Sequence, residues 1–210
     1  MNDTNNRYFI IHKPRNMVSQ FVSSHKVKLL GDLDYTFPEG THAVGRLDNN
    51  SEGLLLLTTN KRVTKLLFES DVPHKRTYLV QVRHVVTEET IERLRSGVSI
   101  RIKGGGDYIT EPCEASIVED PTIYLPITSD IKEYYPNSWI LITLTQGKFR
   151  QVRKMVAAVK HQCKRLIRVS IEDMTLQNLQ PGEVKEIDEN DFFEKLKISK
   201  VYSQPGENLC

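Results

Sequence analysis

The stretch GRLDNNSEGLLLLT, residues 45–58, joins a polar loop to an apolar run. Its four consecutive leucines and Thr58 are long enough for a strand buried on both faces and too short for a typical helix. A strand in the core holds the end of such a loop still, while the loop itself stays open to a substrate. We therefore expect functional side chains in this loop, which carries Arg46, Asp48, Ser51 and Glu52.

Asp48 is the side chain of this loop with the widest chemical range. Its carboxylate can serve as a nucleophile, as a general base or as the acceptor of an ion pair. An aspartate in a loop more often caps a turn or pairs with a neighbour, here Arg46. The residue type alone leaves all of these roles open.

Charge is distributed unevenly along the chain, although the formal net charge is only +2. Residues 134–171 contain no Asp or Glu, whereas residues 172–194 are rich in acids. A solvated surface usually mixes the two signs, so the acid-free segment predicts a basic surface suited to phosphates. The basic residues of this segment are Lys148, Arg150, Arg153, Lys154, Lys160, Lys164, Arg165 and Arg168.

Hydrophobic periodicity predicts a chain that mixes strands and helices. Short helices are expected after the caps Asn60 and Thr87, over the apolar stripe that begins at Val152, and around residues 192–196. The predicted strands cover residues 8–12, 41–44, 54–58, 78–82, 98–102, 115–118, 139–145 and 166–169, and further strands are expected in residues 176–187 around a turn at 181–182.

Several classes of protein are disfavoured. No apolar run approaches the length of a membrane span, and the polar start of the chain does not fit a signal peptide. Cys113, Cys163 and Cys210 are odd in number and widely spaced, which fits a reducing cytoplasm better than a disulfide framework or a zinc site. The histidines form no metal-ligand pattern, so no metal is expected.

Taken together, several stretches resemble the pseudouridine synthases, and most resemble the branch that modifies large-subunit ribosomal RNA. The resemblance covers about residues 8–187 and implies the α+β fold of that family: a mixed, mainly antiparallel sheet with flanking helices and a central RNA-binding cleft. Its motifs are GRLD followed by GLLLLT, Lys13-Pro14, Lys75 or Arg76 with Tyr78, GKFRQVRKM at residues 147–155, Leu166-Ile167-Arg168 and LQPG at residues 179–182.

The resemblance implies a role for particular residues. Asp48 matches the essential catalytic aspartate, Tyr78 the tyrosine that lies against the target base, and Arg153 the arginine that pairs with the aspartate. Physical chemistry also supports the pairing of Arg153 with Asp48, because an arginine at the edge of an apolar helix face needs a carboxylate partner when it is buried. Contacts to RNA or to the base are expected from Arg46, Lys75, Arg76, Lys148, Arg150, Lys154 and Leu166.

The implied reaction isomerises one uridine of ribosomal RNA without a cofactor or a metal. We expect a cytoplasmic monomer with ribosomal RNA as its partner and no membrane association. The expected organisation is a disordered segment at residues 1–7, a catalytic domain of two packed subdomains at residues 8–202 with no RNA-binding module before it, and a flexible tail at 203–210. The irregular residues 121–136 are expected to contribute to specificity.

Alternatives of other kinds remain. The chain can be a non-catalytic RNA-binding or ribosome-assembly protein with the same fold, or a synthase that acts on transfer RNA. A carboxylate-dependent glycosidase would need a second acid near Asp48, and Glu52 is the only nearby candidate.

Overall fold

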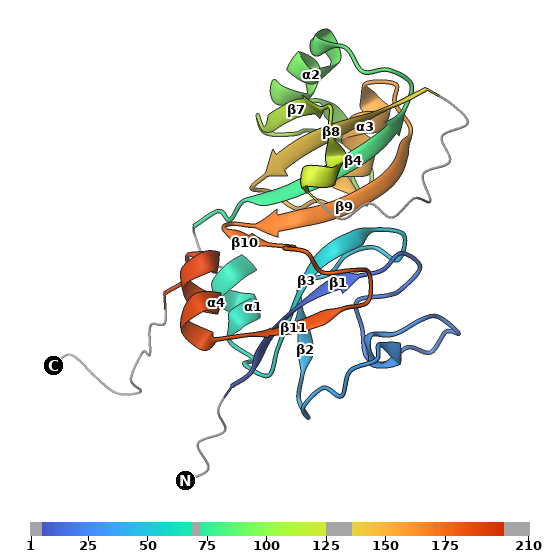
Figure 1. Ribbon diagram of the computed structural model, residues 1–210. Coiled ribbons are helices and arrows are strands. Elements are labelled where there is room, and N and C mark those ends of the chain that lie inside the picture. The colour runs from blue at the N-terminus through green and yellow to red at the C-terminus, as the bar shows by residue number, and fades with distance from the viewer. Residues whose placement is uncertain (1–5, 69–71, 125–135, 200–210) are drawn as a thin grey trace, which may run out of the picture.

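The computed structural model describes residues 6–68, 72–124 and 136–199 (Figure 1). The predicted tail and most of the predicted N-terminal segment and specificity loop lie outside these ranges. The strands are β1 Tyr8–Lys13, β2 His42–Val44, β3 Glu52–Thr58, β4 Arg76–Arg83, β5 Ser99–Arg101, β6 Asp107–Ile109, β7 Glu114–Val118, β8 Asn137–Leu144, β9 Cys163–Ile171, β10 Met174–Thr175 and β11 Val184–Ile187. The α-helices are α1 Val63–Phe68, α2 Glu88–Arg95, α3 Gln151–Ala158 and α4 Glu189–Leu196, and short 3-10 helices cover Leu30–Asp32 and Pro121–Ile123.

Within the described ranges, one sheet in the order β11-β1-β3-β9-β4-β8-β7 runs through the molecule. β2 and β10 extend it beside β3 and β9, while β5 and β6 form a separate small hairpin. Every strand pair of the main sheet is antiparallel except β3 with β9. The predicted α+β fold with a mixed, mainly antiparallel sheet is confirmed.

The sheet has two halves that meet at the β3–β9 pair (Figure 1). In one half, α1 and α4 lie beside β1, β3 and β11; in the other, α2 and α3 lie beside β4, β7 and β8. Each half has one apolar cluster of its own, and a third cluster spans the seam. β3 is buried along its whole length, as predicted for a strand covered on both faces. The division into two packed subdomains remains a prediction, because the sheet is continuous across the seam.

The β3–β9 contact is short and very close. Glu52 lies opposite Ile167 and Gly53 opposite Arg168. Gly53 has a φ of +101°, and a Cβ added there would lie 2.3 Å from the carbonyl oxygen of Arg168. The glycine is therefore required both by its backbone conformation and by the approach of β9. This contact brings the loop before β3 next to the middle of β9.

We expect Gly53→Ala to lower the free energy of unfolding by at least about 2 kcal/mol, since the added methyl group meets backbone rather than a movable side chain. Gly104→Ala is a matched control, because Gly104 has a similar φ of +96° with nothing within 4 Å of the added Cβ. The control isolates the cost of a left-handed backbone, about 1 kcal/mol. Urea denaturation of both variants measures the difference, and equal losses would contradict the close-approach explanation.

The prediction of strands between residues 176 and 183 is wrong. This segment is irregular: Gln177 has a φ of 55°, and single backbone bonds tie Leu176 to Val169 and Gly182 to His12. Pro181 has no N–H to give to a ladder. Only the end of the segment, β11, pairs with β1. The hairpin strand β6 was not predicted.

Candidate active site

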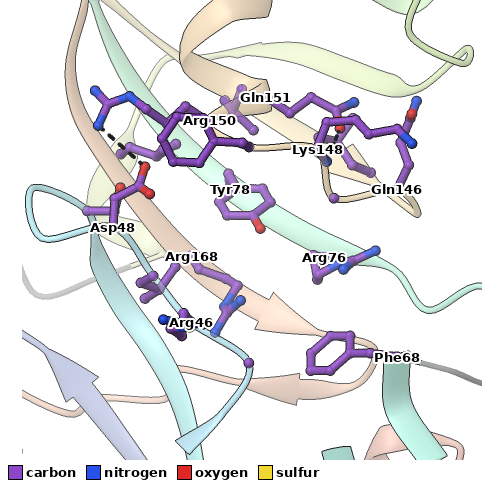
Figure 2. A pocket seen from close by; sticks show the side chains of 18 residues that line it. Arg46, Asp48, Phe68, Arg76, Tyr78, Gln146, Lys148, Arg150, Gln151 and Arg168 are labelled. Atoms are coloured by element: carbon purple, nitrogen blue, oxygen red, sulfur yellow. Dashed lines mark hydrogen bonds and ion pairs between the residues drawn. The ribbon is translucent and has the colours of Figure 1, made fainter. Parts of the chain in front are cut away.

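A cleft of about 330 Å³ opens at the seam between the halves, in the size range of a pocket for a small ligand (Figure 2). It is bordered by the loop before β3, by β4 and β9, and by the segment that leads into α3. Its lining residues are Gly45, Arg46, Leu47, Asp48, Ser51, Phe68, Arg76, Tyr78, Leu144, Gln146, Gly147, Lys148, Phe149, Arg150, Gln151, Val152, Leu166 and Arg168.

Asp48 lies at one end of the cleft, with 28% of its side chain exposed. Its Oδ2 atom is 3.8 Å from Nη1 of Arg150 (Figure 2). The loop is held before Asp48 by the buried Ser19 hydroxyl, which accepts from the N–H of Leu47 and donates to its carbonyl. After Asp48 the loop is held by a backbone bond from Ser51 to the Asp48 carbonyl. The carboxylate is thus fixed in place while it stays open to a ligand.

Tyr78 points into the cleft from β4 and faces Arg168 of β9 (Figure 2). Arg76 lies two residues earlier on the same strand face. Its guanidinium lies over the ring of Phe68 and donates to the carbonyl of Thr145. These side chains supply an aromatic face and a cation beside the space in front of Asp48.

Arg168 is a functional candidate that the sequence motifs did not single out, although it ends the Leu-x-Arg stretch. It is only 3% exposed, and its Nε donates to the carbonyl of Leu54 at 2.8 Å. Burial lowers the pKa of its guanidinium, and the neighbouring Tyr78 acts in the opposite direction. No acceptor within the described ranges lies in hydrogen-bond reach of its Nη2, although the side chain lines the cleft. A buried cation with a donor left over is suited to an anionic or carbonyl oxygen.

Arg153 was expected to pair with Asp48, and the structure gives it other partners. Its Nη2 donates to the carbonyl of Asn50 at 2.8 Å and approaches the Ser51 hydroxyl at 3.3 Å. It does not line the cleft, whereas Arg150, one helical turn earlier, ion-pairs with Asp48. Arg153 therefore supports the loop from behind, and the ion pair of Asp48 that the structure shows is with Arg150.

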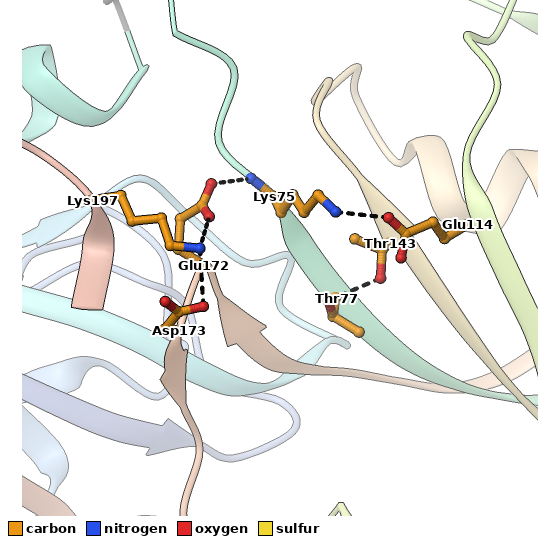
Figure 3. A network of polar contacts seen from close by, with 7 residues as sticks. All are labelled: Lys75, Thr77, Glu114, Thr143, Glu172, Asp173 and Lys197. Atoms are coloured by element: carbon orange, nitrogen blue, oxygen red, sulfur yellow. Dashed lines mark hydrogen bonds and ion pairs between the residues drawn. The ribbon is translucent and has the colours of Figure 1, made fainter. Parts of the chain in front are cut away.

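Lys75 and Lys154, two of the expected RNA contacts, also lie outside the cleft lining. The Nζ of Lys75 ion-pairs with Glu114 at 2.7 Å, and its backbone N–H donates to Glu172 (Figure 3). Lys154 lies over the ring of Phe149. The remaining expected contacts do line the cleft: Arg46, Arg76, Lys148, Arg150 and Leu166.

The cleft is strongly basic. Asp48 is the one carboxylate in its lining, against five cationic side chains: Arg46, Arg76, Lys148, Arg150 and Arg168. Such a wall attracts a polyanion and concentrates it at the carboxylate.

Glu52, the second acid that a glycosidase would need, is buried in an ion pair. Its two carboxylate oxygens accept from Nε and Nη2 of Arg165 at 3.1 and 2.8 Å, and the side chain does not line the cleft. The bidentate pair occupies both oxygens of Glu52. The glycosidase alternative therefore lacks its second carboxylate.

Lys13 ends β1, and its side chain is fully buried. Its Nζ donates to the carbonyls of Pro14 and Met17. Burial lowers the pKa of Lys13 from 10.5 to about 8, against the opposing charges of Glu52 and Asp48. The ammonium thus braces the turn after β1 at a cost in desolvation.

This burial predicts a pH dependence of stability. Between pH 8 and 10.5 the unfolded chain holds the Lys13 proton more tightly than the folded chain does, so stability rises with pH in this window. Relative to Lys13→Met, the wild type is expected to gain up to about 3 kcal/mol of unfolding free energy across the window. Denaturation of both proteins at several pH values measures the gain, and parallel curves would contradict it.

Within the described ranges, no cluster of three or more His, Cys, Asp or Glu side chains has a geometry that could hold a metal ion. The same part of the chain contains no helix with the length and apolarity needed to cross a membrane.

Comparison with known proteins identifies relatives of the chain. The family model described as RNA pseudouridylate synthase matches residues 7–158. The chain is 36% identical to ribosomal large subunit pseudouridine synthase E of Vibrio vulnificus over 184 residues, which cover 86% of this chain and 75% of the relative. It is 31% identical to the protein of the same name from Xanthomonas axonopodis, over 82% and 89% of the two chains.

The fold has a close counterpart among solved structures. A crystal structure of a pseudouridylate synthase superposes with a TM-score of 0.73 at 24% identity, over 91% of this chain and 74% of the other. The family model spans most of the chain, including the Asp48 loop, β4 and the whole of α3. The chain therefore belongs to the RNA pseudouridylate synthase family of isomerases.

Proposed function

We propose that this protein converts a uridine of large-subunit ribosomal RNA to pseudouridine, with Asp48 as the catalytic carboxylate. One observation carries the proposal: Asp48, Tyr78 and the buried Arg168 line one basic cleft. The choice of large-subunit RNA draws on the names of the relatives from Vibrio and Xanthomonas.

The proposed reaction is an isomerisation in which no atom or electron is gained overall. The bond from ribose carbon 1′ to N1 of uracil breaks, the base turns, and a new bond forms from carbon 1′ to carbon 5. The proton on carbon 5 leaves, and the freed N1 takes one up. Asp48 acts as the nucleophile, either on the base or on carbon 1′. The reaction as proposed uses no metal and no cofactor.

The side chains around Asp48 take complementary roles in this proposal. A uridine within stacked RNA is out of reach, so the base must be extruded into the cleft. Tyr78 offers its ring as a stacking face and its hydroxyl for the proton transfer at carbon 5. Arg168 orients the Asp48 carboxylate with the donor that the fold leaves over. Arg46, Arg76, Lys148 and Arg150 bind phosphates, which makes affinity fall with salt.

The experiment is release of tritium from RNA labelled at carbon 5 of uridine. Unmodified large-subunit RNA, small-subunit RNA and transfer RNA are supplied separately, and the new pseudouridine is then mapped. Release from large-subunit RNA alone supports the proposal. Release only from transfer RNA would move the substrate to that class, and binding of all three RNAs without release would favour a non-catalytic binding or assembly protein.

We further infer that the protein acts as a monomer in the cytoplasm. The inference of the location draws on Cys113 and Cys163, which have no disulfide partner among the described residues. Sedimentation equilibrium at micromolar concentration tests the monomer, and fractionation of cells tests the location.

A further inference from the structure

Phe149 stands out on the surface of the cleft. It is 62% exposed, and it is the one aromatic ring among the exposed large hydrophobic side chains of the described ranges. A large aromatic side chain left in water forgoes a substantial burial free energy. Since Phe149 lines the same cleft as Asp48, its exposure calls for a ligand that covers it.

Cations surround this ring. Lys148 and Arg150 are its neighbours in the chain and line the cleft with it, and the Nζ of Lys154 lies 5.4 Å from the ring centroid. An apolar protein surface would be a poor match for three positive charges around one phenyl group. A nucleotide matches both features, because its base has a flat π face and its phosphates are anionic.

The segment that carries Phe149 is held firmly. The N–H of Lys148 donates to Oε1 of the buried Gln151, and the N–H of Gln151 donates to the carbonyl of Lys148. The Nζ of Lys148 also lies 5.0 Å from the ring centroid of Tyr108, whose hydroxyl donates to Gln146. The ring is therefore presented on a braced turn, so little conformational entropy is lost when a ligand covers it.

We propose that Phe149 is a stacking platform for the base of a nucleotide next to the target uridine, in a single-stranded part of the RNA. The target base itself goes deeper, to Tyr78 and Asp48, while Phe149 holds its neighbour in the chain and Lys148, Arg150 and Lys154 hold the adjoining phosphates. The inference rests on the proposed function for the identity of the target, but not for the binding of RNA.

The test compares Phe149→Leu, which keeps an apolar side chain without a π face, with Phe149→Trp, which keeps the face. Val85→Ala is the matched control, since Val85 is 69% exposed and does not line the cleft. Binding is measured with a short fluorescein-labelled oligouridylate and with an abasic probe of the same length that keeps only the ribose and phosphate. The fold of each variant is checked by its melting temperature.

Phe149→Leu is expected to bind the oligouridylate about 5- to 150-fold more weakly than wild type, the cost of losing one base–aromatic stack. Its affinity for the abasic probe is expected to stay at the wild-type value. Phe149→Trp is expected to bind at least as tightly as wild type, and the oligouridylate is expected to quench its added indole fluorescence. Trp139, the single tryptophan of the chain, is buried and does not line the cleft, so its emission is expected to be a steady background.

Equal binding of the oligouridylate by wild type and Phe149→Leu overturns the inference, as does an equal loss on both probes or an absence of quenching in Phe149→Trp. These readouts need no turnover. A protein that binds in the expected way but forms no pseudouridine would contradict the proposed function alone. One that isomerises uridine and tolerates Phe149→Leu in binding would contradict this inference alone.

Discussion

Asp48→Asn is expected to lower the rate of pseudouridine formation by at least about 10⁴-fold, the loss typical of removing a nucleophile. The amide has nearly the same shape as the carboxylate but cannot attack carbon 1′ or the base. Within the described ranges the one ion pair of Asp48 is long, 3.8 Å to Arg150, so the fold is expected to tolerate the amide. Single-turnover tritium release with enzyme in excess measures the chemical step directly.

Asp48→Asn is expected to keep its affinity for RNA while it loses activity. Removal of the one carboxylate from a cleft with five cations leaves affinity for RNA equal or slightly tighter. Asp34→Asn serves as the control, because Asp34 is exposed and outside the cleft. Activity of Asp48→Asn within about tenfold of the control would rule out Asp48 as the catalytic carboxylate.

Arg168→Met is expected to lower the turnover rate by about a hundred- to a thousandfold, the range for loss of one pre-positioned donor in an active site. Methionine keeps the apolar stem and removes the guanidinium. Arg168 is buried without an ion-pair partner within the described ranges, and its pKa is lowered by burial. Burying such a charge destabilises the fold, so its removal in Arg168→Met offsets the loss of the hydrogen bond to the Leu54 carbonyl. The melting temperature is therefore expected to stay the same or rise.

Arg153→Met is the comparison for Arg168→Met. The family resemblance favours Arg153 as the arginine that acts with Asp48, whereas the structure favours Arg168. Arg153 holds the Asn50 carbonyl and the Ser51 hydroxyl, so its loss loosens the loop and is expected to cost only about tenfold in rate. Parallel single-turnover and thermal-melting measurements on both variants decide between them. A larger loss of rate in Arg153→Met than in Arg168→Met would restore the pairing with Asp48 that the family motif implies.

Periodicity carried most of the prediction of the fold. The leucine run after Gly53 is buried along its whole length, and Thr87 caps α2 through its side chain, as expected. The irregular segment after Leu176 has an apolar pattern that predicts a strand, but its apolar residues pack against the core without a ladder. An apolar pattern in the sequence indicates which side chains are buried, and a buried side chain does not require a regular backbone.

The same distinction applies to the basic residues. Side chains of a strand alternate between its faces, so Tyr78 and Arg76 share a face and point into the cleft, while Lys75 bonds elsewhere. By the same rule, the expectation that Leu166 lines the pocket implies that Arg168 does so too, two residues further on. That signal is present in the sequence, although the motifs alone did not single out Arg168 as a site residue.

The sequence by itself determined the fold class, the buried strand behind the loop, the catalytic aspartate as candidate and the basic segment that faces it. The buried strand and the basic segment depend on local pattern and composition, whereas the fold class and the choice of Asp48 rest on the motifs that resemble the pseudouridine synthases. Only the tertiary structure decided which arginine meets the cleft. That choice depends on the rotation of α3 about its axis and on the close register of β3 with β9 at Gly53, both of which arise from packing between segments far apart in the chain.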